Sequence, residues 1–186
     1  SKFNGKTKDI FINQGIIQEI ADSIVKKSAK EITLDNLHVS QGWLDTGVCF
    51  GEPGLEERET IENGSLTACL SGFTDIILNS NTLPVIDSKA DIIYVQSKNK
   101  NNALKIHPLG ALTLKSEGSE MAELREMFDS GAIGFYDYKM SVKNPNLLKT
   151  ALQYVQHFDG LIMTFPFEKS ICKGGQMNEG EISTLY

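Results

Sequence analysis

The sequence of 186 residues lacks most features that place a chain in a specialised class. No apolar run approaches the roughly 18–20 residues of a membrane-spanning helix, and the polar start SKFNGKTKD does not resemble a signal peptide. Its three cysteines form no C-x-x-C pair, so we expect no disulfide framework and a cytoplasmic, reducing compartment. The net charge of -6 argues against a nucleic-acid or anionic-membrane partner.

Common catalytic motifs are missing as well. No G-x-G-x-x-G follows a strand-like segment, no P-loop is present, and no G-x-S-x-G elbow places a nucleophile beside a base. The histidines His38, His107 and His157 lie far apart in the sequence, and none has the spacing of a metal-ligand motif. Each of them is most simply interpreted as a structural or surface residue.

What the sequence does contain is an alternation of strand-like and helix-like segments after a small β-rich start. The segments DIFINQ and IIQEI flank an Asn-Gln-Gly turn, which predicts a hairpin, and KEITLDN predicts a further strand. From Gly42 onward, strand and helix alternate five times, with helices expected over residues 55–70 and 119–128, among others. This alternation predicts a parallel sheet with helical crossovers.

Two architectures fit this alternation. One is an open doubly wound sheet, and the other is a (β/α)₈ barrel of which the chain holds only a part. A complete barrel needs about 250 residues, which is more than the sequence offers. In both architectures, chemistry is located at the carboxyl ends of the parallel strands, so the segments that follow the predicted strands are the candidate sites.

Those segments offer few metal donors. Cys49 and Asp137 are plausible donors, but a zinc site takes three or four protein ligands. Cys49 is more simply a buried small apolar residue, and Asp137 a solvated or hydrogen-bonded loop carboxylate. Asn81 could orient a polar ligand or close an Asx turn. The acidic stretch EPGLEERET fits a helix start, where the helix dipole favours carboxylates, and KGGQMNEGE could contact an anion.

Several stretches together resemble the dihydroorotases of the cyclic amidohydrolase group. The stretches are EPGLEERETIENGSLTACLSGFTDI, NTLPVID, GSEMAEL, SGAIGF and KGGQMNEGEIS. The resemblance implies a TIM-like (β/α) amidohydrolase barrel, with about the first five βα units in residues 42–186 and part of a small β-sandwich in residues 1–41. It also implies pyrimidine biosynthesis, in which the family uses zinc to hydrolyse the cyclic amide of dihydroorotate reversibly to carbamoyl aspartate.

The chain departs from the family at the metal-binding positions. The resemblance places metal-binding histidines at Gly47, Cys49 and Phe165, and a substrate-binding arginine at Gly51. Glycine and phenylalanine side chains cannot donate to a metal ion. We therefore expect no catalytic residue and no metal or other cofactor in this chain.

Two polar residues do match the family. Asp137 falls in the region of the bridging aspartate, which makes it a residual metal candidate, and Asn81 matches an asparagine that contacts the substrate. These matches suggest that a ligand contact has survived the loss of the metal-binding histidines.

The resulting expectation is a dihydroorotase-like chain without dihydroorotase activity. The family implies either a homo-oligomer, such as a dimer, or a structural partnership with aspartate transcarbamoylase. Two alternatives stay open: a module that binds another small molecule, and an active enzyme whose remaining ligands lie outside this chain. Because part of a barrel leaves strand edges unpaired, we expect a further segment or a partner chain, unless the sheet is open.

Overall fold

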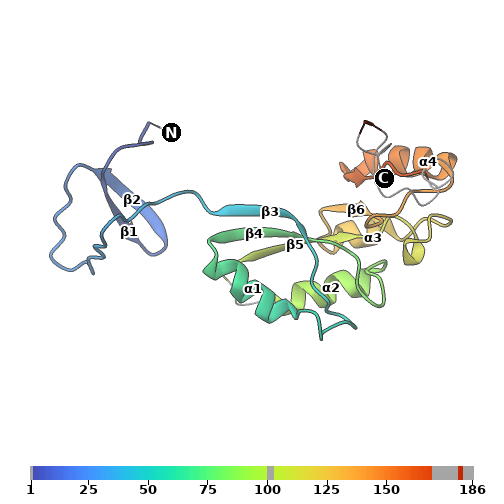
Figure 1. The fold of residues 1–186 in the computed structure, drawn as a ribbon, viewed down its shortest axis with the longest axis horizontal. Coiled ribbons are helices and arrows are strands. Elements are labelled where there is room, and N and C mark those ends of the chain that lie inside the picture. Colours follow the sequence, from blue (N-terminus) through green and yellow to red (C-terminus); the bar gives the residue numbers. More distant parts are fainter. Residues whose placement is uncertain (1, 100–102, 169–179, 182–186) are drawn as a thin grey trace. The chain divides into compact units, whose positions relative to one another are not determined.

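The computed structural model describes residues 2–99, 103–168 and 180–181 (Figure 1). The chain divides into two compact units, Ser1–Ser40 and Gln41–Tyr186, and each is considered by itself below. Within the described residues, no helix combines the length and the apolar character needed to cross a membrane.

The first unit contains the predicted hairpin. Strand β1 (Asp9–Asn13) pairs antiparallel with β2 (Ile16–Ala21). Gln14 and Gly15 between them both have positive φ angles, of 50° and 75°, as a tight hairpin turn requires. The hairpin prediction is therefore confirmed.

The further strand predicted over KEITLDN is wrong. Residues 30–36 form no strand, and β1 and β2 pair only with each other among the described strands of this unit. Ile32 and Leu34, the apolar residues on which the prediction depended, are exposed. A strand needs a neighbour to pair with, and this segment has none in the described unit. The β-sandwich in residues 1–41 stays a prediction.

The second unit is built on a parallel sheet in chain order. Five strands lie side by side as β3-β4-β5-β6-β7, and each pairs parallel with the next. The strands are β3 (Trp43–Val48), β4 (Phe73–Leu78), β5 (Lys105–Gly110), β6 (Gly134–Tyr136) and β7 (Ile162–Met163). The crossovers contain α1 (Ile61–Leu70), α2 (Lys89–Lys98), α3 (Leu124–Asp129) and α4 (Pro145–Val155), with short 3₁₀ segments η1 (Leu114–Ser116) and η2 (Gln156–Phe158). The predicted alternation and parallel pairing are confirmed.

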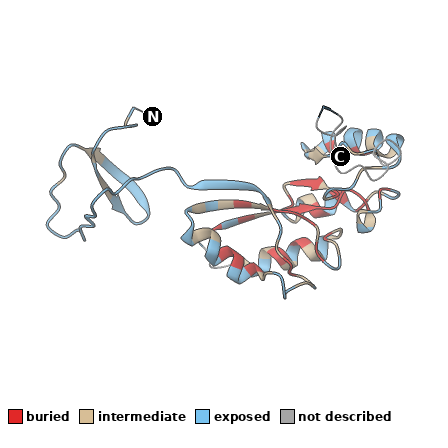
Figure 2. Ribbon diagram, in the orientation of Figure 1, coloured by how far each residue is buried: buried red, intermediate tan, exposed pale blue. Residues whose placement is uncertain are grey.

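The helices pack on one face of this sheet. Ile76, Leu78 and Ile106 alternate with less buried neighbours along β4 and β5, as strand geometry dictates, and they join a core cluster. Buried residues of all four α-helices belong to the same cluster, so one apolar layer lies between the helices and the strands (Figures 1 and 2). A doubly wound sheet carries helices on both faces, whereas this curled sheet with helices on one face fits part of a TIM-like barrel.

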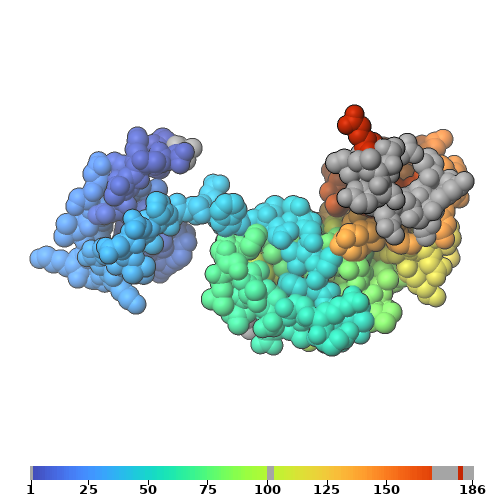
Figure 3. All heavy atoms as spheres, viewed as in Figure 1, coloured from blue at the N-terminus to red at the C-terminus, as the bar shows by residue number. Residues whose placement is uncertain are grey.

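Helix α1 begins later than the sequence predicts. The helix was expected from Leu55, but it starts at Ile61 with Thr60 as N-cap, whose hydroxyl accepts from the backbone N of Asn63 at 3.1 Å. The residues before it form a closed loop, in which the backbone N of Gly51 donates to the carbonyl of Glu59 at 2.9 Å. The exposed residues of this loop form part of the cyan-to-turquoise surface in Figure 3.

Helix α3 is shorter than predicted because its expected first turns pair with another loop. Met121 forms an isolated antiparallel bridge with Thr113, and the backbone N of Ala122 donates to the carbonyl of Leu112 at 3.0 Å. Helix α3 therefore begins only at Leu124. In contrast, α4 begins as predicted: Asn144 caps it and accepts from the backbone N of Asn146 at 3.0 Å, followed by Pro145.

Candidate functional site

The parallel order of the strands brings their carboxyl ends to one edge of the sheet, and hydrogen bonds join the loops there. The backbone N of Asn79 after β4 donates to Val48 of β3 at 2.9 Å. The Ser80 hydroxyl donates to the carbonyl of Tyr136 on β6 at 2.9 Å, although 56 residues separate the two. The edge is thus one connected polar layer rather than a set of independent loops.

Asp137, the residual metal candidate, is fully engaged within the protein. Its side chain is only 2% exposed, and one carboxylate oxygen accepts from the backbone N of Leu112 at 2.9 Å and of Thr113 at 3.0 Å. The other oxygen accepts from the Thr113 hydroxyl at 2.6 Å. The carboxylate therefore links the loops that follow β5 and β6, and these three hydrogen bonds leave it little capacity to accept from another partner.

Cys49 is exposed, so the expectation of a buried apolar residue is wrong. Its neighbours Val48 and Phe50 pack against the core, which directs the intervening side chain away from the helices. The Asn79 amide nitrogen lies 3.5 Å from the Cys49 sulfur and 3.1 Å from the Val48 carbonyl oxygen.

Asn81 lies in the loop between β4 and α2. Its Oδ1 atom is buried and has no hydrogen-bond partner among the described residues. A buried amide oxygen without a donor is costly, by about 1–3 kcal/mol, and such an atom is a candidate contact for a ligand. No Asx turn accounts for this oxygen, and the role of Asn81 as a ligand contact stays a prediction.

Gly47 and Gly51 stand where the resemblance places a histidine and an arginine, and they differ in the space around them. A Cβ atom added at Gly47 would meet only the Asp45 carboxylate oxygen, at 3.9 Å. A Cβ atom at Gly51 would overlap the carbonyl oxygen of Leu55, which lies within the closed loop. The backbone therefore accepts a side chain at residue 47 and excludes one at residue 51, where the resemblance places an arginine.

Phe165 follows β7, and its ring lies against that of Phe167, with 5.8 Å between the ring centroids. The site residues Gly47, Cys49, Asn81 and Asp137 follow or end other strands of the same sheet. Most of the KGGQMNEGE stretch, including the suggested anion contact, lies outside the described residues.

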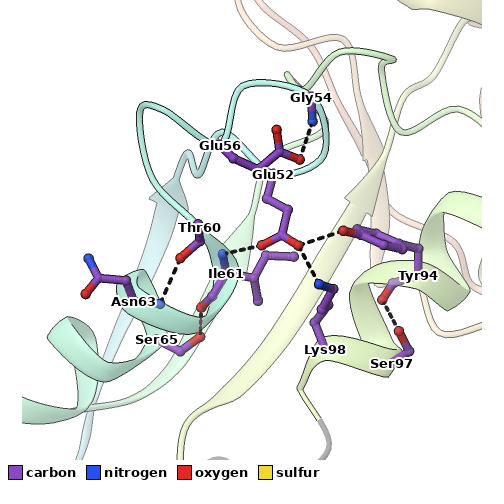
Figure 4. Close-up of polar contacts among 10 residues, drawn as sticks. All are labelled: Glu52, Gly54, Glu56, Thr60, Ile61, Asn63, Ser65, Tyr94, Ser97 and Lys98. Atoms are coloured by element: carbon purple, nitrogen blue, oxygen red, sulfur yellow. Dashed lines mark hydrogen bonds and ion pairs between the residues drawn. The ribbon is translucent and has the colours of Figure 1, made fainter.

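Glu52 lies in the loop after β3 and has a buried carboxylate (Figure 4). The sequence alone explains this residue only by the preference of carboxylates for a helix start. Glu52 is 6% exposed, and its Oε2 accepts from the backbone N of Ile61 at 2.8 Å. Its Oε1 accepts from the Tyr94 hydroxyl at 2.6 Å and from the Lys98 ammonium at 2.8 Å, both on α2. This one side chain joins the β3 loop to the first residue of α1 and to the last turns of α2.

These contacts change the proton affinities of all three side chains. Burial raises the pKa of Glu52, but the hydrogen bonds from Lys98, Tyr94 and Ile61, with the charge of Lys98, outweigh burial and lower it. The hydrogen bond to Glu52 raises the pKa of Tyr94 and also that of Lys98. Tyr94 and Lys98 lie four residues apart and thus share a helix face, but the sequence does not indicate which carboxylate faces them.

A second ionisable pair lies farther down the strands. His107 of β5 and Asp75 of β4 are 2.8 Å apart, and both are part-buried. The hydrogen bond from His107, followed by that from Thr74, lowers the pKa of Asp75. Asp75 and His107 alternate along their strands with the buried Ile76 and Ile106, so they belong to the face opposite the helices. His107 is therefore a structural histidine with an identified partner.

The donor set does not fit a zinc ion. Among the described residues, no three histidine, cysteine or carboxylate side chains cluster in a way that could hold a metal. Gly47 and Phe165 offer no donor atom, and Asp137 already accepts from Leu112 and Thr113. By themselves, these described side chains supply fewer donors than a zinc site takes.

A curled parallel sheet with helices on one face, and with polar loops gathered at the carboxyl ends of its strands, defines a barrel-type α/β protein. Residues 38–186 match the family model described as Dihydro-orotase-like. The chain belongs to this dihydroorotase-like family.

Curated relatives agree with this assignment. The chain is 35% identical over 178 residues to the dihydroorotase of Pelotomaculum thermopropionicum, covering 96% of this chain and 42% of that protein. It is 34% identical to the dihydroorotase of Acetivibrio thermocellus, with 95% and 42% covered. With the dihydroorotase of Caldanaerobacter subterraneus it shares 32% identity, with 98% and 43% covered. The chain thus spans less than half the length of these relatives.

The different surroundings of the two glycines lead to a first prediction. Gly51→Ala should lower the free energy of unfolding by more than about 2 kcal/mol, because the new methyl group overlaps a backbone oxygen that closes the loop. The matched control Gly47→Ala should change it by no more than about 0.5 kcal/mol. Urea denaturation followed by circular dichroism measures both. Equal effects of the two substitutions would contradict the closed-loop conformation.

The lowered pKa of Glu52 predicts a pH-dependent contribution to stability. The ionised carboxylate stabilises the fold above its ordinary pKa of 4.5, and this contribution is lost as the pH falls through the lower pKa of the folded state. The stability difference between the wild type and Glu52→Gln should therefore shrink on acidification from pH 6 to pH 3. Lys98 and Tyr94, the other groups facing Glu52, stay protonated throughout this range.

Urea midpoints of both proteins across this pH range test the prediction. Glu57→Gln, at an exposed position of the same loop, is the control and should run parallel to the wild type. A constant difference between the wild type and Glu52→Gln at every pH would show that Glu52 gains nothing from its ionised form.

Proposed function

We propose that this chain is a non-catalytic member of the dihydroorotase-like family. The observation that carries the proposal is the chemistry of the strand ends, where Gly47, Cys49 and Phe165 stand at the positions of the family's metal-binding histidines. The carboxylate retained there is that of Asp137, and both of its oxygens accept hydrogen bonds from Leu112 and Thr113.

The consequence follows from what zinc contributes to amide hydrolysis. Bound zinc lowers the pKa of its water from 15.7 to about 7 and polarises the carbonyl group under attack. Without a metal-holding donor set, no side chain of this edge replaces either effect. Recognition of a substrate carboxylate is weakened too, because the loop around Gly51 leaves no space for the bidentate arginine.

Binding of a small molecule is the second candidate function, and Asn81 favours it. Its buried Oδ1 has no donor among the described residues and is suited to accept from an N–H or O–H group of a ligand. The remaining alternative, an active dihydroorotase, needs metal ligands supplied from outside this chain.

A direct assay tests the loss of catalysis. Purified chain, incubated with zinc and dihydroorotate, should show no carbamoyl aspartate formation above a heat-denatured sample and should retain clearly less than one zinc per chain. The dihydroorotase of Pelotomaculum thermopropionicum serves as the positive control in the same buffer. Zinc at one equivalent or more, together with turnover that scales with zinc, would overturn the proposal.

We further propose a structural role beside aspartate transcarbamoylase. Edge strands with exposed apolar side chains are normally covered, and Trp43 and Leu44 of β3 are exposed in this unit. A partner chain that covers β3 would not need the Asn81 side chain.

Size-exclusion chromatography with light scattering measures this association. The chain of 20.5 kDa should elute with aspartate transcarbamoylase, and Asn81→Ala should leave the complex intact, because the proposed contact is made by β3 and not by Asn81. Elution at the mass of two chains would indicate a homodimer instead, and elution as a monomer in both runs would contradict a structural role.

A further inference from the structure

Glu52 is connected, through the residues that follow it, to the loop between β4 and α2, although its own side chain does not contact that loop. Its carboxylate is held by the backbone of Ile61 and by Tyr94 and Lys98 of α2, at distances between 2.6 and 2.8 Å. A buried carboxylate with an ammonium, a hydroxyl and a backbone donor has little freedom to move. The backbone that follows Glu52 is therefore fixed at its first residue.

The next two residues contact the loop between β4 and α2. The carbonyl of Pro53 accepts from the backbone N of Leu83 at 3.1 Å. Gly54 lies so close that a Cβ atom there would overlap the carbonyl oxygen of Leu83, and its φ of +86° also favours glycine. The loop after β3 thus touches the loop after β4 backbone to backbone, immediately after the anchored carboxylate.

Leu83 lies two residues after Asn81, in the middle of its loop. The ends of this loop are held elsewhere: the Ser80 hydroxyl donates to Tyr136, and the backbone N of Ala111 donates to the carbonyl of Ile86 at 2.7 Å. Within the loop, the Ser80 carbonyl accepts from the backbone N of Thr82 and of Ile86, and the Thr82 hydroxyl donates to Pro84. Among the contacts of the described residues, the hydrogen bond that Leu83 N donates to the Pro53 carbonyl is the one that ties the centre of the loop to the loop of another strand. Residues 53 and 54 therefore contribute to the position of Asn81.

The contacts form a closed circuit. The loop with Asn81 leads into α2, the last turns of α2 hold Glu52, and the residues after Glu52 return to the centre of the same loop. We propose that Glu52, held by Tyr94 and Lys98, is a positioning residue that fixes Asn81 and its unpaired Oδ1 at the ligand-binding edge. The inference rests on the proposed function only where it makes Asn81 a ligand contact.

Amide hydrogen exchange of the purified chain tests this coupling residue by residue. Glu52→Ala should raise the exchange rates of the amides in residues 81–83 by at least about tenfold more than those of β5, because the loop loses its central contact. The amides of β5, which lie in the sheet core, should exchange faster only by the factor that the loss of global stability measured in urea accounts for. Glu57→Gln, on the exposed side of the same loop, should leave both regions unchanged.

Milder variants keep the test informative if Glu52→Ala does not fold. Tyr94→Phe and Lys98→Met each remove one donor to Glu52 and should raise exchange in residues 81–83 by smaller factors than Glu52→Ala. Glu52→Gln should have an effect between those of the donor variants and the alanine variant. A uniform rise that includes β5 would indicate a general loss of stability and overturn the proposal. Unchanged exchange in the loop of all folded variants would overturn it as well.

Failure of this inference is separable from failure of the proposed function. Hydrogen exchange in residues 81–83 needs no ligand, zinc or turnover, so an active enzyme would contradict the lack of catalysis and leave the coupling in place. Conversely, the chain could bind no zinc and turn over no dihydroorotate, as proposed. The coupling would still be contradicted if the exchange rates of the loop were the same in the wild type and the Glu52 variants.

Discussion

Parallel pairing in chain order is the constraint on which the second unit depends. Each crossover returns the chain to the same end of the sheet, so the segments that follow β3, β4, β5 and β6 meet at one edge although they are far apart in the sequence. The hydrogen bond from Ser80 to Tyr136 is a direct consequence of this arrangement. With the helices packed on one face, the other face keeps polar residues such as Asp75 and His107.

Two buried carboxylates stabilise the loops at this edge by different means. Asp137 accepts from backbone and hydroxyl donors of the loop after β5, whereas Glu52 has an ammonium partner in Lys98. Burying a charge is costly unless donors replace the lost water, and both side chains meet this condition within the chain.

Periodicity predicted the elements that depend on local signals. The turn at Gln14 and Gly15 and the cap at Asn144 are set by backbone and capping preferences of a few adjacent residues, and both occur where the sequence placed them. The predictions that failed depended on distant partners. Residues 30–36 have the composition of a strand but no neighbour to pair with, and Met121 pairs with Thr113 instead of continuing a helix.

The candidate site divides in the same way. Which positions lack a metal donor is a matter of residue identity, so Gly47 and Phe165 could be named from the sequence with its family resemblance. Whether a side chain fits at Gly51, or whether Cys49 is exposed, depends on where the backbone runs. Glu52 was missed as a site residue because its partners on α2 lie more than 40 residues away.

The sequence by itself determined the order of strands and helices and, through its resemblance, the family, and it showed that Gly47 and Phe165 carry no metal donor, because these follow from local patterns and from the chemistry of single side chains. Only the tertiary structure decided that Asp137 and Glu52 are spent on internal contacts, that Asn81 presents an unpaired oxygen, and that the loop at Gly51 is closed. Those properties arise because parallel pairing brings together residues that are far apart in the sequence. Short stretches of sequence do not indicate which distant residues come into contact.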